Sequence, residues 1–144
     1  MTKRLKKIMS ALVLATLVLS LTGQVVKAST SAIDDYYFYF DGAAGDIYDY
    51  SEGMQPKTNA SYSYVTYPSY GGEKSFTAAV IGATLYGQYR ENITLDSVRI
   101  NPGEEEVIVH NWVYENDLPF AVLRGEADYD EIYTTEGTWE ADAY

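Results

Sequence analysis

The chain has 144 residues, with 10 Lys and Arg against 21 Asp and Glu, one His and no Cys. The absence of Cys excludes disulfides, thiolate zinc sites and a cysteine nucleophile. The acidic excess argues against nucleic acid and anionic membranes as partners, because both are bound by clustered Lys and Arg.

The first 28 residues have the three regions of a helical secretory signal peptide. A basic start, Met1–Lys7, precedes an apolar run, Ile8–Leu21, which is shorter than the roughly 20 residues of a membrane-spanning helix. Val26-Lys27-Ala28 predicts cleavage between Ala28 and Ser29. Five Lys and Arg against 21 Asp and Glu then leave a net charge of −16. We expect a secreted protein without a membrane anchor, either released or loosely associated with the cell surface.

Runs of alternating, β-branched and aromatic residues predict an all-β chain after a flexible tail over residues 29–35. The expected strands are 36–40, 60–67, 75–86, 93–100, 106–114, 120–127 and 134–141. Short strands separated by turn residues indicate an antiparallel β-sandwich, formed as a single domain over residues 36–144. A small β-barrel is the alternative architecture.

Three positions predict local irregularities in these strands. Gly82 lies inside a long strand and indicates a bulge or a close approach of another backbone. The apolar phase changes near Asp96-Ser97, which predicts a second bulge. Asn101-Pro102-Gly103 has the residue order of a type II turn, which requires a positive φ at Gly103.

The alternation also assigns faces to two strands. Tyr62, Tyr64 and Thr66 share one face of strand 60–67. In strand 106–114, the valines 107, 109 and 113 face the core, whereas Ile108, His110, Trp112 and Tyr114 face outward. Exposed aromatic rows suit sugar rings or protein partners, although tyrosine also covers sheets simply because it favours strands. The candidate binding surface comprises Tyr62, Tyr64, Trp112 and Tyr114.

The sequence assigns no catalytic residue, metal ligand or cofactor. His110 is the single histidine, and no Gly-x-Ser-x-Gly motif accompanies it. None of the acidic clusters has the spacing of an EF-hand loop, so we interpret them as solvated surface. The turn Asp128-Tyr129-Asp130-Glu131 is the best candidate for weak calcium binding.

Short segments at the two ends of the mature chain point to one group of proteins. They are Tyr37-Phe38-Tyr39-Phe40, close behind the leader, and Ala121–Gly125 followed by Gly137–Asp142. On these motifs the chain resembles small secreted proteins of unknown function from Gram-positive bacteria. The resemblance implies secretion and supplies no catalytic residue. Bacteriocins of the lactococcin type are similar in size and leader, but they are usually rich in basic residues or His.

We therefore expect a secreted, strongly acidic, non-enzymatic protein that binds a protein or glycan through its surface. Two alternatives come from other functional classes. One is a bacteriocin-like antagonistic protein, and the other is an acid-dependent hydrolase that uses paired carboxylates.

Overall fold

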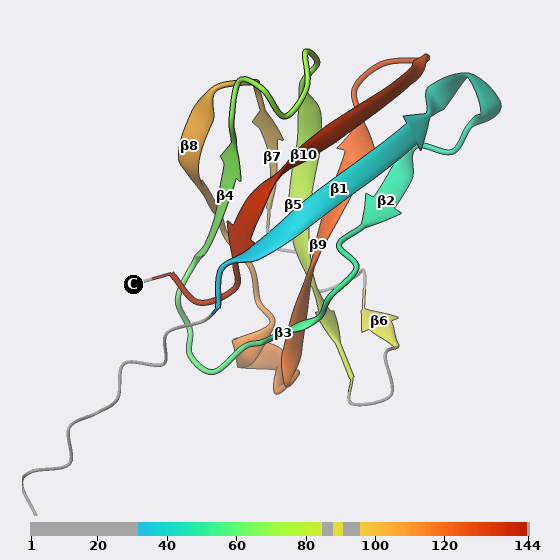
Figure 1. Ribbon diagram of the computed structural model, residues 1–144. Coiled ribbons are helices and arrows are strands. Elements are labelled where there is room, and N and C mark those ends of the chain that lie inside the picture. The colour runs from blue at the N-terminus through green and yellow to red at the C-terminus, as the bar shows by residue number, and fades with distance from the viewer. Residues whose placement is uncertain (1–31, 85–87, 91–95, 144) are drawn as a thin grey trace, which may run out of the picture. The chain divides into compact units, whose positions relative to one another are not determined.

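The computed structural model describes residues 32–84, 88–90 and 96–143, and this part of the chain is all-β (Figure 1). Its strands form two antiparallel sheets that are not closed into a barrel. Between the strands lie short 3₁₀ turns, Gly42–Ala44 and Tyr114–Asn116 among them. The β-sandwich expected from the strand pattern is confirmed. In the described residues no helix is long and apolar enough to cross a membrane.

The first sheet has the order β1-β10-β4-β8. Its strands are β1 (Asp34–Asp41), β10 (Ile132–Glu140), β4 (Ser63–Tyr67) and β8 (Glu104–Val109). The latest of these strands in the sequence, β10, therefore lies inside the sheet between β1 and β4 (Figure 1).

The second sheet has the order β2-β9-β5-β6, with β3 also paired to β9 and β7 to β5. Its strands are β2 (Tyr48–Tyr50), β9 (Phe120–Ala127), β5 (Phe76–Ala83), β6 (Tyr89–Arg90), β3 (Gln55–Pro56) and β7 (Ser97–Ile100). The β5–β9 register runs without a break along the whole of β5. Gly82 pairs with Ala121 on one side and Arg90 on the other, so of the two irregularities predicted there the bulge is wrong.

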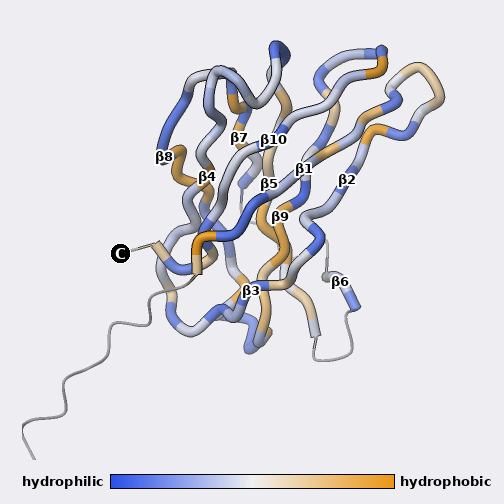
Figure 2. Tube along the Cα trace, viewed as in Figure 1, coloured by the Kyte–Doolittle hydropathy of each residue, from blue (hydrophilic) through white to orange (hydrophobic). Residues whose placement is uncertain are grey.

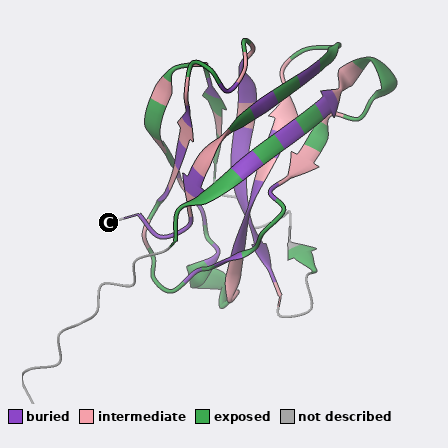
Figure 3. Ribbon diagram, viewed as in Figure 1, coloured by how far each residue is buried: buried purple, intermediate pink, exposed green. Residues whose placement is uncertain are grey.

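Aromatic side chains dominate the core between the sheets. Along β1, Tyr36, Phe38 and Phe40 are buried while Tyr37 and Tyr39 are exposed, an alternation visible in Figure 3. The inward rings meet β5, whose hydrophobic stretch lies beside that of β9 (Figure 2). The opposite face of the second sheet buries a smaller cluster of Ile81, Ala83 and Val122. Because both faces of β5 are covered, it reads as a continuous apolar run.

Several predicted boundaries differ from the structure, among them the start of the first strand and the end of the strand predicted over 106–114. β1 begins at Asp34, inside the predicted tail. β8 ends at Val109 rather than at residue 114. The side-chain amide of Asn111 donates to Ser63 Oγ at 3.2 Å and its oxygen accepts from the Val113 N–H at 3.3 Å. These local bonds compete with the strand ladder and turn the chain towards the following 3₁₀ segment.

The turn between β7 and β8 agrees with its prediction. Gly103 has a φ of 89°, and the Glu104 N–H donates to the Asn101 carbonyl at 3.2 Å. The predicted cleavage site at Ala28 and Ser29, and residues 93–95 of the predicted phase change, lie outside the described residues.

Candidate functional site

The solvent-facing side of the first sheet contains a groove with a volume of about 570 Å³. We call it the acidic groove. It is lined by Asp35, Tyr36, Tyr37, Glu52, Thr66, Pro68, Tyr70, Glu105, Glu136, Gly137 and Thr138.

The floor of the groove is formed by β1, β10 and β4, and their register sets which side chains lie opposite one another. Asp35 of β1 pairs with Thr138 of β10, which pairs in turn with Thr66 of β4. Tyr37 pairs with Glu136 in the next outward row. Directly opposite side chains on one face of a sheet lie about 5 Å apart, so two carboxylates and a phenol ring stand side by side here.

A β-bulge supplies the carboxylate on the β8 side. Val65 pairs with Val107 and Tyr67 with Glu104, so Glu105 and Glu106 together face the single residue Thr66. Glu106 has a φ of 54°, and its N–H donates to Thr66 Oγ1 at 3.4 Å. Bulges re-aim side chains. This one directs Glu105 into the groove and Glu106 into an adjacent hollow of about 100 Å³.

The loop that carries Pro68 and Tyr70 forms one wall. Its Gly71 carbonyl accepts from the Glu136 N–H at 2.8 Å, which attaches the loop to β10. A Cβ on Gly71 would lie 2.1 Å from the Glu136 oxygen, so no larger residue fits this approach. At the tip, the Tyr70 side chain is 84% exposed and available to a partner.

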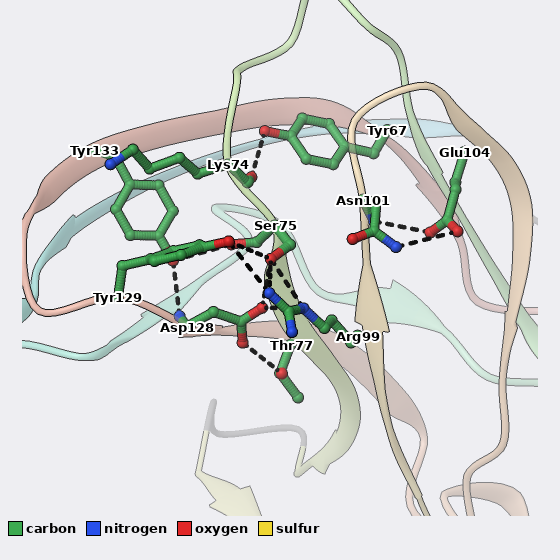
Figure 4. Close-up of polar contacts among 10 residues, drawn as sticks. All are labelled: Tyr67, Lys74, Ser75, Thr77, Arg99, Asn101, Glu104, Asp128, Tyr129 and Tyr133. Carbon is green, nitrogen blue, oxygen red and sulfur yellow. Dashed lines mark hydrogen bonds and ion pairs between the residues drawn. The ribbon is translucent and has the colours of Figure 1, made fainter.

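A polar network fixes the end of this loop at Ser75, just before β5 begins (Figure 4). Ser75 Oγ donates to Asp128 Oδ2 at 2.8 Å and accepts from Arg99 Nε at 2.9 Å. Thr77 Oγ1 donates to Asp128 Oδ1 at 2.7 Å, and Arg99 also donates to the Tyr129 hydroxyl at 3.2 Å. Ser75 is buried and satisfied as both donor and acceptor, so we assign it a structural role.

Two tyrosine hydroxyls complete this network by donating to backbone carbonyls at the end of the loop. The Tyr67 hydroxyl donates to the Lys74 carbonyl at 2.9 Å, and the Tyr133 hydroxyl donates to the Ser75 carbonyl at 3.2 Å (Figure 4). Burial and the neighbouring Tyr133 raise the pKa of Tyr67 to about 12. Burial likewise raises the pKa of Tyr133. Both phenols are therefore neutral donors at physiological pH.

The predicted calcium turn takes part in this network instead. Both carboxylate oxygens of Asp128 are engaged by Ser75, Thr77 and Arg99, and Glu131 forms an ion pair with Lys74. Across the described ranges, no group of three or more His, Asp or Glu side chains could hold a metal ion. Calcium at this turn would have to displace contacts that already compensate the charge of Asp128.

The remaining wall is the loop after β2. Buried Ser51 donates its N–H to the Leu123 carbonyl at 2.8 Å and accepts from the Leu123 N–H at 3.2 Å. These two bonds tie the loop to β9. Exposed Glu52 follows directly and is one of the residues that line the groove.

None of the described residues that line the groove carries a positive charge. The cations whose side chains are described pair with carboxylates elsewhere in the fold. These pairs are Lys57 with Asp142, Lys74 with Glu131, Arg99 with Asp128, and Arg124 with Glu126. The carboxylates of Asp35, Glu52, Glu105 and Glu136 therefore add to a single negative potential over a surface that also exposes Tyr37 and Tyr70.

None of the four predicted aromatic residues is among those that line the groove. Tyr62 is 46% exposed, and its ring packs edge-on against His110 at 4.5 Å between centroids. Tyr64 lines the adjacent hollow together with Glu106. Trp112 and Tyr114 are exposed in the segment after β8 and line neither the groove nor the adjacent hollow.

Sequence reasoning missed the residues that do line the groove. Tyr37 could have been found, because it is an outward residue of the alternating run that forms β1. Glu52 comes from a predicted loop and Glu105 from a bulge. Neither has a local sequence signal that places it beside β1 or β10.

Comparisons with known proteins give a family but no activity. Residues 24–143 match the model of a family described as "Protein of unknown function (DUF2712)". Searches of curated proteins and of solved structures gave no match. The family match covers most of the chain, including every residue of the acidic groove. The protein therefore belongs to the DUF2712 family of proteins of unknown function.

Proposed function

We propose that this protein is a secreted, non-enzymatic binding protein whose acidic groove holds a basic segment of a protein partner. The groove carries the proposal, because it combines four exposed carboxylates and two exposed tyrosines, and no described residue of its lining is a cation. Carboxylates attract Lys and Arg, and tyrosine faces add cation–π contacts at roughly 0.5–1 kcal/mol each at exposed sites.

The long-range charge supports the same kind of partner. The net charge of −16 after the leader attracts basic molecules and repels acidic ones. Electrostatic attraction of this kind mainly accelerates association and weakens at high salt. The volume of about 570 Å³ falls within the range of roughly 300–1,000 Å³ that is typical of ligand sites. A few residues of an extended chain fit such a space.

Neutralising the groove should weaken binding of a basic peptide. We expect Glu52→Gln/Glu105→Gln/Glu136→Gln to lower the affinity for a fluorescent Lys-Gly repeat peptide about tenfold, from roughly 0.5 kcal/mol per lost charge pair. The measurement is fluorescence anisotropy at low and high salt. A matched control, Glu73→Gln/Glu115→Gln/Asp130→Asn, removes the same charge from exposed positions outside the groove.

The control distinguishes binding in the groove from attraction by the overall negative charge. Equal losses in both triple variants would contradict the groove as the binding site. A neutral oligosaccharide that binds while the basic peptide does not would instead favour the glycan alternative. In that case Tyr62→Ala and Trp112→Ala would be the variants to compare, because both side chains are exposed.

A further inference from the structure

The segment 132–143 completes the first sheet from its centre. β10 pairs with β1 along the full length of β1, from Asp34↔Trp139 to Asp41↔Ile132. On its other side, β10 pairs with β4 through Thr138↔Thr66 and its neighbours. In the sheet order, β10 is the neighbour that links β1 to the rest of the sheet. Without β10, the paired strands of that sheet would be reduced to β4 and β8.

Residues that follow β10 are held by a buried polar cluster. The Ala141 N–H donates to Gln55 Oε1 at 2.9 Å, and Gln55 Nε2 donates to the Trp139 carbonyl at 3.1 Å. The Ala141 carbonyl accepts from Ser63 Oγ at 2.9 Å and from Lys57 Nζ at 2.8 Å. These partners lie on the far side of the chain in sequence, 78 to 86 residues away.

An ion pair stands at the centre of this cluster. Lys57 Nζ lies 2.9 Å from Asp142 Oδ1, and the two side chains are 0% and 1% exposed. Asp142 Oδ2 accepts from the N–H and the hydroxyl of Thr58 at 2.9 and 2.6 Å. Burial alone would raise the pKa of Asp142, but the bonds from Thr58 and Lys57 outweigh it and hold this pKa below its usual value. Losing Asp142 would leave Lys57 as a buried cation without its counter-ion, which is strongly unfavourable.

The strand pairs of the second sheet include no residue from 132–143. Its strands lie between Tyr48 and Ala127, and the longest pairing, β5 with β9, is complete within that range. Contacts between nearer segments form faster, because closing a shorter loop loses less chain entropy. The β1–β10 pairing instead joins opposite ends of the described region.

From this arrangement we infer that residues 132–143 are a closing segment that docks last, inserting between β1 and β4 and becoming fixed through the Lys57–Asp142 pair. Glu136 and Thr138 of the closing segment also form part of the groove floor. The groove therefore assembles only when the segment has docked. That docking of the closing segment is needed for binding rests on the proposed function, whereas the folding order does not.

Pulsed hydrogen exchange during refolding of the full chain tests the order of docking. We expect amides of β5 and β9 to gain protection in an earlier phase than amides of β1 and β10. The Asp142→Ala variant should increase native-state exchange of the β1 and β10 amides by at least about 100-fold, the effect of breaking a buried ion pair. It should change the exchange of β5 and β9 amides much less.

The control for Asp142 is a second carboxylate, one that lies outside the buried cluster. Asp130→Ala removes an exposed charge next to the same β9–β10 turn and should leave all four strands unchanged. Simultaneous protection of all four strands in the wild-type chain, or earlier protection of β1 and β10, would overturn the inference. That readout stands even if Asp142→Ala does not fold. No ligand is involved, so a failed binding experiment would leave this result standing and the reverse also holds.

Discussion

Phe76→Ala is expected to lower the free energy of unfolding by about 3–5 kcal/mol, the usual cost of truncating a buried aromatic side chain to Ala. The Phe76 ring is fully buried on β5, where it meets Tyr36, Phe38, Phe40 and Tyr67 at centroid distances between 5.4 and 6.5 Å. Domains of this size are stable by roughly 5–15 kcal/mol, so the variant should be close to unfolding at physiological temperature.

Urea unfolding measured by tryptophan fluorescence checks this expectation. Phe76→Leu preserves most of the buried volume and should cost less than about 2 kcal/mol. Tyr39→Ala removes a ring from the exposed face of β1 and should cost less than about 1 kcal/mol. A Phe76→Ala variant as stable as Tyr39→Ala would show that the aromatic core does not pack as described.

Alkaline pH is expected to unfold the protein as buried tyrosines ionise. Burial raises the pKa of Tyr36 well above its ordinary value, and burial with the charge of Tyr133 raises that of Tyr67 to about 12. A raised folded-state pKa means that stability is complete below pH 10, the unfolded value, and is lost as the pH rises towards the folded value. For Tyr67 the two-unit difference corresponds to on the order of 3 kcal/mol lost between pH 10 and 12.

The measurement is tyrosinate absorbance and far-UV circular dichroism across that pH range. We expect the buried Tyr36 and Tyr67 to ionise together with loss of the β signal. Tyr36→Phe should shift the unfolding to higher pH, because it removes a buried group that ionises. The hydroxyl that is lost makes only a long 3.4 Å bond to the Thr66 carbonyl. Tyr70→Phe, at a residue that is 84% exposed, should leave the transition in place. A smooth titration of all tyrosines without unfolding would contradict the prediction.

Local sequence pattern was sufficient for several strands. The predicted strand 120–127 coincides with β9, and the alternation in 60–67 separates Ser63, Val65 and Tyr67, which the structure buries, from Tyr64 and Thr66 on the other face. These elements follow from period-two hydrophobicity, which a short window contains in full. The short strands β2, β3 and β6 were missed, because two or three residues cannot show a period.

The candidate site was less accessible to sequence reasoning. Its tyrosines and carboxylates could be counted, but the four carboxylates of the groove are contributed by β1, β8, β10 and the loop after β2. Lys57 and Asp142 are spaced widely in the chain, so nothing near either residue indicates that it is buried and paired. Such neighbours are chosen by strand order and register, which depend on how whole sheets pack.

By itself, the sequence determined the all-β class, the division of the β4 side chains between its two faces, and the sign of the surface charge. These properties depend on residues adjacent in the chain or on composition alone. Only the tertiary structure decided that β10 inserts between β1 and β4, that a bulge turns Glu105 towards β10, and that acidic and phenolic side chains line one groove. Each of these depends on contacts between distant segments, which form because together they bury the aromatic core.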